Sequence, residues 1–253
     1  MKCPTVLILV FLPVLALAGT VRETKDINLS AKDINMLVVN CGAGLLDLKG
    51  IEGLEKVKVT AEIEIEDFKK EGLQKFIEKN VRLNLTKRNK RAFLISEIQT
   101  NSLNDVEARI NITIETPKEL DVKITDSSGP ISIRDLVGNL KIDDDSGKIT
   151  IENITGSVTV DDGSGSIIIE DINGRVMITD GSGFIEAAFI KGDVYITDAS
   201  GDMTIRHVDG NVTVSDGSGD IDISEVSKNV FIREAGSGEL EIERVKGKVT
   251  MRE

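Results

Sequence analysis

A repeat of 18 residues is the feature that most constrains how this chain can fold. Ser-Gly pairs recur at this spacing and end at Gly129, Gly147, Gly165, Gly183, Gly201 and Gly219. A second series of glycines falls midway between them, at Gly138, Gly156, Gly174, Gly192 and Gly210. The unit is therefore nine residues long and is used twice in each period. So short and regular a repeat is typical of a chain that coils into stacked rungs.

The apolar residues inside each unit indicate its secondary structure. They lie two apart, as in Ile167 and Ile169 or Val176 and Ile178. Alternating β-branched residues between Gly, Asp and Ser are typical of short strands with one buried face, whereas a helix needs apolar residues three and four apart. The sequence therefore predicts an all-β fold, a parallel β-solenoid with 18-residue rungs of two nine-residue half-rungs. About seven rungs fit into residues 120–253.

The rungs have two kinds of corner. The first strand of each rung is followed by an apolar residue that we expect to enter the core: Leu136, Ile154, Ile172, Ile190, Val208, Val226 and Val245. The second strand is followed by Asp, a small residue, Ser and Gly, as in residues 162–165. This is tight-turn chemistry, in which the glycine takes a positive φ.

Residues 1–18 have the pattern of a secretory signal peptide. Lys2 precedes an apolar stretch that ends at Ala16-Leu17-Ala18, as a cleavable signal does. This stretch is shorter than the ~20 apolar residues of a membrane span. We therefore expect an exported chain, periplasmic, cell-surface or secreted, with no membrane span after signal removal. Its one remaining cysteine, Cys41, cannot form an internal disulfide.

Residues 19–119 lose the strict repeat but keep alternating segments at 56–65 and 108–116. Between these segments, near residues 66–80, Phe68, Leu73 and Phe76 have the spacing of one amphipathic helix. An uncovered first rung would expose core and strand edges, so we expect this irregular part to cap the rod. No such part follows the last repeat, and self-association through the carboxyl-terminal rung is therefore a hypothesis.

The charge of the chain lies in its repeat. The whole chain has a formal charge of −12, residues 19–125 hold 18 basic and 18 acidic side chains, and residues 126–253 hold 12 basic and 25 acidic ones. A nucleic-acid binder needs clustered Lys and Arg to neutralise phosphates. The sequence therefore excludes nucleic acid as a partner.

An aspartate column is the sharpest candidate for a metal site. One aspartate recurs at the same position of each rung: Asp126, Asp144, Asp162, Asp180, Asp198 and Asp216. Asp143, Asp145 and Asp161 add acid to its first rungs. Carboxylates stacked about 4.8 Å apart repel each other, so either Ca²⁺ neutralises them or backbone N–H groups of the turns satisfy them. Both interpretations stay open, and no other cofactor is predicted.

Other functional residues are scarce. One histidine and two cysteines leave little material for a catalytic triad or a His/Cys metal cage. The single histidine, His207, falls at a corner, where we expect a solvated side chain. The chain is therefore predicted not to be an enzyme.

A stripe of large side chains suggests a contact surface. Met177, Tyr195 and Phe231 share one column on the outer face of the second strand. Scattered exposed apolar residues need no explanation, but an aligned set can mark a site of partner binding. We predict a partner surface at these three residues.

The segment TPKELDVKITDSSGPISI (116–133) and the G-x-V-x-I-x-D-x-S-G repeats after it resemble the "putative adhesin" β-solenoid domains of uncharacterised exported bacterial envelope proteins. The resemblance implies an exported module without known catalytic residues. We expect a non-enzymatic structural or adhesive module that presents its faces to a protein or envelope surface component. An acidic calcium-binding solenoid and an end-to-end polymerising envelope scaffold are the alternatives.

Overall fold

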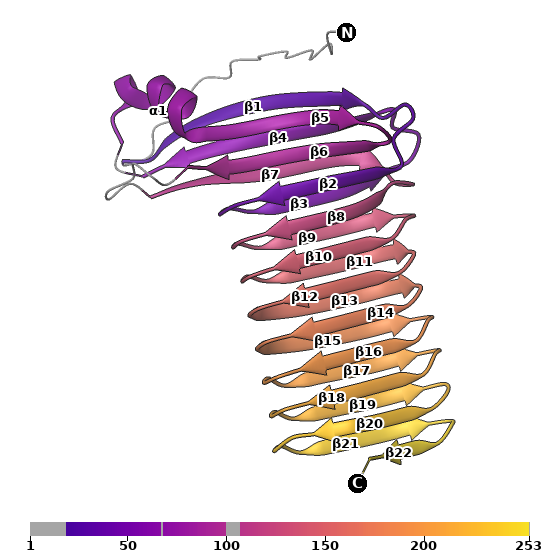
Figure 1. The fold of residues 1–253 in the computed structure, drawn as a ribbon. Coiled ribbons are helices and arrows are strands. Elements are labelled where there is room, and N and C mark those ends of the chain that lie inside the picture. The colour runs from indigo at the N-terminus through magenta and orange to yellow at the C-terminus, as the bar shows by residue number, and fades with distance from the viewer. Residues whose placement is uncertain (1–18, 67, 100–106, 253) are drawn as a thin grey trace.

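The structure is a computed structural model that describes residues 19–66, 68–99 and 107–252. The predicted signal peptide, 1–18, lies outside the described residues. The chain forms two sheets of 11 strands each, and Figure 1 shows their rungs stacked into a rod. The predicted parallel β-solenoid with 18-residue rungs is confirmed.

Each rung of the rod gives one strand to each sheet, because its two half-rungs run on opposite sides of one core. The first sheet contains the strands β9 (Ile131–Leu136), β11 (Ile149–Thr155), β13 (Gly165–Asn173), β15 (Gly183–Ile190), β17 (Met203–Val208), β19 (Ile221–Val226) and β21 (Leu240–Val245). The second contains β8 (Asp121–Asp126), β10 (Leu140–Asp144), β12 (Val158–Asp162), β14 (Val176–Asp180), β16 (Val194–Asp198), β18 (Val212–Asp216), β20 (Val230–Ala235) and β22 (Val249–Met251).

Earlier strands extend both sheets at the amino-terminal end of the rod (Figure 1). They are β1 (Val21–Ser30), β2 (Met36–Cys41), β3 (Leu46–Ile51), β4 (Lys56–Ile65), β5 (Val81–Arg88), β6 (Arg91–Ile98) and β7 (Ala108–Pro117). β2 pairs in parallel with β8, and β3 with β9, so these two strands form a rung that continues the rod. β4 lies between β1 and β7 and pairs antiparallel with both, and β5 pairs antiparallel with β6. Both sheets run without interruption past residue 119, and the division of the chain there stays a prediction.

The predicted helix is shorter than expected. Residues 66–80 hold the 3-10 turn η1 (Lys70–Gly72) and the α-helix α1 (Leu73–Asn80). Gly72 lies at the start of α1, and glycine is a poor interior helix residue, so the regular helix begins only after it. Phe68 lies outside the helix and packs edge-on against Phe76, with ring centroids 5.1 Å apart.

The first-strand corners widen the core as predicted. Their apolar residues from Leu136 to Val226 are about 1% exposed, and Val245 is half-buried in the last rung. These side chains join the inward residues of both sheets in one apolar cluster. Within the described part of the chain, no helix is long and apolar enough to cross a membrane.

Candidate functional site

The first-strand corners hold a column of residues in the left-handed backbone region. One residue per rung has a φ between 53° and 63°: Asp135, Asn153, Asp171, Phe189, His207, Glu225 and Arg244. Asp and Asn tolerate this conformation, but larger side chains rarely adopt it. The 18-residue repeat did not predict this conformation, although the Asp and Asn residues in three successive rungs were a signal for it.

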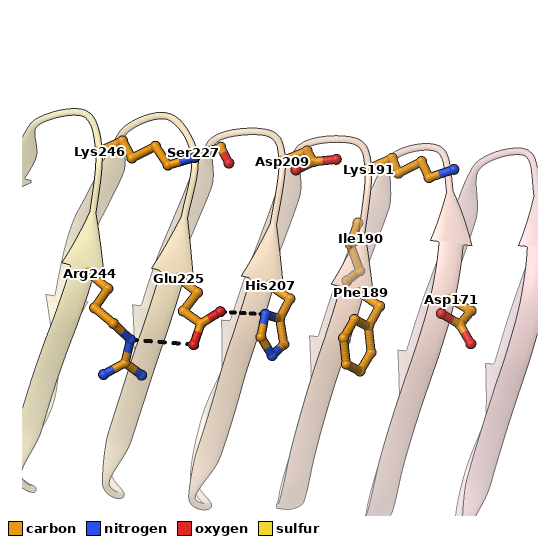
Figure 2. Close-up of a pocket in the computed structure, with 10 residues that line it drawn as sticks. All are labelled: Asp171, Phe189, Ile190, Lys191, His207, Asp209, Glu225, Ser227, Arg244 and Lys246. Atoms are coloured by element: carbon orange, nitrogen blue, oxygen red, sulfur yellow. Dashed lines mark ion pairs between the residues drawn. The ribbon is translucent and has the colours of Figure 1, made fainter.

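Four of these side chains form a continuous chain along the rod, as Figure 2 shows. The rings of Phe189 and His207 stack with centroids 4.6 Å apart and planes 9° apart. His207 Nδ1 lies 2.6 Å from Glu225 Oε2, and Glu225 Oε1 lies 3.4 Å from Arg244 Nε. His207 is exposed at the corner, as expected, but its ring is fixed by a neighbour on each side.

A second row of side chains lies beside this chain, two residues further along each rung (Figure 2). It consists of Lys191, Asp209, Ser227 and Lys246. The two rows line an open groove of about 570 Å³, which we call the corner groove. The corner groove offers an aromatic face, carboxylates and cationic groups along one line.

The aspartate column lies at the opposite corner and points into the core. Asp126, Asp144, Asp162, Asp180, Asp198 and Asp216 are each at most 4% exposed. Asp180 Oδ1 accepts a hydrogen bond from the Ser182 N–H at 3.2 Å, and Asp198 Oδ1 accepts one from the Ser200 N–H at 3.2 Å. Every carboxyl of the column still has a buried oxygen without a hydrogen-bond partner among the described residues. The turns therefore satisfy the column only in part.

Burial raises the pKa of every aspartate in the column, because an apolar surrounding disfavours the charged form. The pKa of Asp126 rises to about 7, with Asp144 adding to the effect of burial. The pKa of Asp162 also rises to about 7, and burial acts there together with its neighbours in the column. The pKa of Asp198 rises to about 6 for the same reasons.

The other acids of the predicted metal site lie elsewhere. Asp143 and Asp161 are register partners on the outer face of the second sheet, and both are exposed, as is Asp145 in the adjacent turn. The structure thus separates the nine predicted residues into a buried set and an exposed set. Among the described residues, no group of three or more acidic, His or Cys side chains is arranged to hold a metal ion. Calcium binding stays one of the two interpretations of the column.

In the rung before Asp126, Cys41 takes the place of the column aspartate. Cys41 follows Asn40, whose register partner is Thr125, and so lies beside Asp126. Burial raises the pKa of the Cys41 thiol, and the charge of Asp126 raises it further. Cys41 is half-buried and pairs in register with Ser96, whose hydroxyl is buried. A neutral thiol at this position suits a structural role rather than a nucleophile.

The predicted partner stripe lies on the outer face of the second sheet. Met177 and Tyr195 are register partners, and Thr213 separates Tyr195 from Phe231. Met177 is 42% exposed, and the other two side chains are half-buried. The Arg175 guanidinium lies 5.6 Å from the centroid of the Tyr195 ring. The structure therefore brings the three residues together on one face.

The sequence profile of the Toastrack DUF4097 family matches residues 51–251, which is most of the chain. The chain belongs to the Toastrack family. This assignment confirms the resemblance to putative-adhesin β-solenoid proteins. The match covers the corner groove, the aspartate column and the partner stripe.

Solved structures similar to this Toastrack chain include proteins from three bacteria. A putative cell adhesion protein from Clostridium sporogenes is 12% identical, with a TM-score of 0.35, and the match covers 91% of this chain and 98% of that one. A putative adhesin from Bacteroides fragilis is 12% identical, with a TM-score of 0.37, and the match covers 91% of this chain and 97% of that one. A putative lipid binding protein from Parabacteroides distasonis is 15% identical, with a TM-score of 0.39, and the match covers 92% of this chain and 97% of that one. These similarities are too low to transfer a function. A comparison with curated proteins found no match.

Proposed function

We propose that this Toastrack chain is an exported, non-enzymatic interaction module that presents the outer face of its second sheet to a protein or other component of the cell surface. The observation that carries the proposal is the register pairing of Met177 with Tyr195 on an exposed sheet face. Export rests on the signal-peptide pattern of residues 1–18.

The composition of the partner stripe supports this role. Threonine occupies the same column at positions 159, 213 and 250, and it is a strand residue that solvent accepts. The large side chains of Met177, Tyr195 and Phe231 replace it in three rungs without any gain to the core. Aromatic residues and methionine are enriched in protein interfaces.

A cell-binding experiment tests the contact surface. The matched variant M177T/Y195T/F231T gives these rungs the threonine of their neighbours, so the rod should keep its stability. We expect wild-type protein to bind intact cells of the source organism and this variant to lose at least about tenfold in affinity, as when a few anchor residues dominate an interface. Equal binding of the two proteins would overturn the proposal.

Photocrosslinking locates the contact independently. We expect p-benzoylphenylalanine at position 195 to form adducts on the cell surface. The same residue at position 204, on the outer face of the first sheet, should form none. Export is tested by the mass of the mature chain, which should begin at Gly19.

A further inference from the structure

We propose that the corner groove binds a neutral, hydroxyl-rich polysaccharide chain that lies along the axis of the rod. This site lies at the corner after the first sheet, away from Met177, Tyr195 and Phe231, and it takes a different class of ligand. The inference therefore goes beyond the proposed function.

The backbone of the corner supplies the first argument. At Asp135, Asn153 and Asp171 the left-handed position carries residues that tolerate it, whereas four successive rungs carry Phe189, His207, Glu225 and Arg244 instead. Non-glycine residues in this region cost roughly 1 kcal/mol or more each. The four unfavourable residues are consecutive and in contact. Unfavourable backbone conformations held in one cluster point to a functional site.

The side chains supply the second argument. Phe189 is 47% exposed although it is a large apolar residue. His207 covers one face of its ring, so the opposite face is the one that can pack against the C–H face of a sugar ring. Asp171 and Lys191 lie beside it, and Asp209, Glu225 and Arg244 follow along the groove in the next rungs (Figure 2). These polar groups accept or donate several hydrogen bonds. An exposed aromatic ring beside such groups matches a pyranose, which has one apolar face and a rim of hydroxyls.

The charge of the corner groove selects among polysaccharides. Its lining holds three carboxylates and three cationic groups: Asp171, Asp209, Glu225, Lys191, Arg244 and Lys246. The groove is thus balanced, whereas the surrounding repeat, residues 126–253, carries 25 acids against 12 bases. The acidic rod repels a polyanion, and the three cations of the groove oppose a polycation. A neutral chain meets neither obstacle.

The ladder geometry favours a polysaccharide over a peptide. The groove crosses β13, β15, β17, β19 and β21, which pair with each other in sequence. Their backbone groups are already used in the sheet, so an extended peptide finds no free strand edge to join. Rungs about 4.8 Å apart instead repeat the side-chain positions at intervals close to the length of one sugar unit.

A titration of the full chain tests the ligand class. The probes are linear oligosaccharides of glucan, xylan and mannan type, with oligogalacturonate and chitosan oligomers as anionic and cationic counterparts. We expect saturable binding to at least one neutral probe and at least tenfold weaker binding to both charged probes. No binding to any neutral probe, or a preference for a charged one, would overturn the proposal.

A matched variant separates binding from folding. F189N/H207N/E225D/R244N gives four rungs the residue types that stand at Asp135, Asn153 and Asp171, so its melting temperature should equal or exceed that of the wild type. We expect it to lose at least about tenfold in affinity for the neutral probe, as for other aromatic anchors. If it binds the probe as wild type does, the groove is not the site.

The two proposals fail independently. The groove variant should still form cell-surface adducts from position 195, and M177T/Y195T/F231T should still bind the oligosaccharide. Loss of oligosaccharide binding in the stripe variant would place the ligand on the second sheet and overturn the assignment to the corner groove.

Discussion

Asp144 and Asp162 are register partners on adjacent parallel strands, and both carboxyl groups point into the core. Parallel strands lie about 4.8 Å apart, so two ionised carboxylates here would repel each other in a poorly solvated place. Burial and this repulsion raise the pKa values of the column, so the free energy of unfolding should depend on pH.

The rod should be more stable at pH 5 than at pH 8. An unfolded aspartate has a pKa near 3.9, whereas that of Asp126 and Asp162 is about 7 and that of Asp198 about 6 in the folded chain. The folded state therefore holds protons that the unfolded state releases. The resulting stabilisation is complete below about pH 4 and is lost as the pH rises through about 7. Urea unfolding at several pH values measures it.

D162N is the matched variant for this prediction. Its amide cannot ionise and can donate to the neighbouring carboxylates, so it should stabilise the rod at pH 8 by about 1–3 kcal/mol, the cost of an unsatisfied buried polar group. It should also flatten the pH profile. A urea midpoint that rises from pH 5 to pH 8 in the wild type would contradict the burial of the column.

Calcium should leave the melting temperature unchanged. The unpartnered oxygens of Asp126, Asp144 and Asp162 are closed to solvent, so a hydrated ion can reach them only if the corner opens. A ligand that binds the folded state would raise the melting temperature by mass action. Melting curves with and without calcium chloride make the comparison. A rise that disappears in D162N would instead support the calcium ladder.

G183A should destabilise the rod by more than about 2 kcal/mol. Gly183 has a φ of +144°, and a Cβ there would lie 1.5 Å from the carbonyl oxygen of Gly165 in the rung below. Urea unfolding measures the loss. G42A is the control, because a Cβ at Gly42 would lie 3.9 Å from its nearest neighbour, the carbonyl oxygen of Ser96. Equal losses in the two variants would show that the close approach at Gly183 is not what demands glycine.

E64A should cost about 1–3 kcal/mol, because it removes the shared partner of two arginines. Glu64 is 3% exposed, and its carboxylate lies 2.6 Å from Arg22 Nε and 2.5 Å from Arg109 Nη2. E62A is the control, since the side chain of Glu62 is 42% exposed and lies 4.0 Å from Arg22, and solvent-exposed pairs contribute up to about 1 kcal/mol. The free energy of unfolding of both variants tests this ranking.

Much of the candidate site was within reach of the sequence. The 18-residue period places Phe189, His207 and Glu225 in neighbouring rungs, so their proximity follows from the repeat alone. The left-handed backbone did not follow, because Phe, His and Glu are not residues that indicate it. Asp180 follows Val176 and Ile178 at intervals of two, which predicts an inward side chain. Its place in a tight turn predicts hydrogen bonds from the backbone N–H groups of that turn. The structure shows that the side chain points inward and that the turn satisfies it only in part.

The sequence by itself determined the rod, because a nine-residue unit with two inward apolar residues can bury them only by stacking like on like. Only the tertiary structure decided where the stack begins. β3 ends at Ile51, and its neighbour in the rod, β9, begins at Ile131. The chain must therefore come back to pair β9 with β3 after a long intervening segment. This pairing is long-range, and no local conformational preference encodes it. The same distinction holds at the corners. The local sequence determines each turn, whereas the corner groove forms only because residues of successive rungs lie side by side.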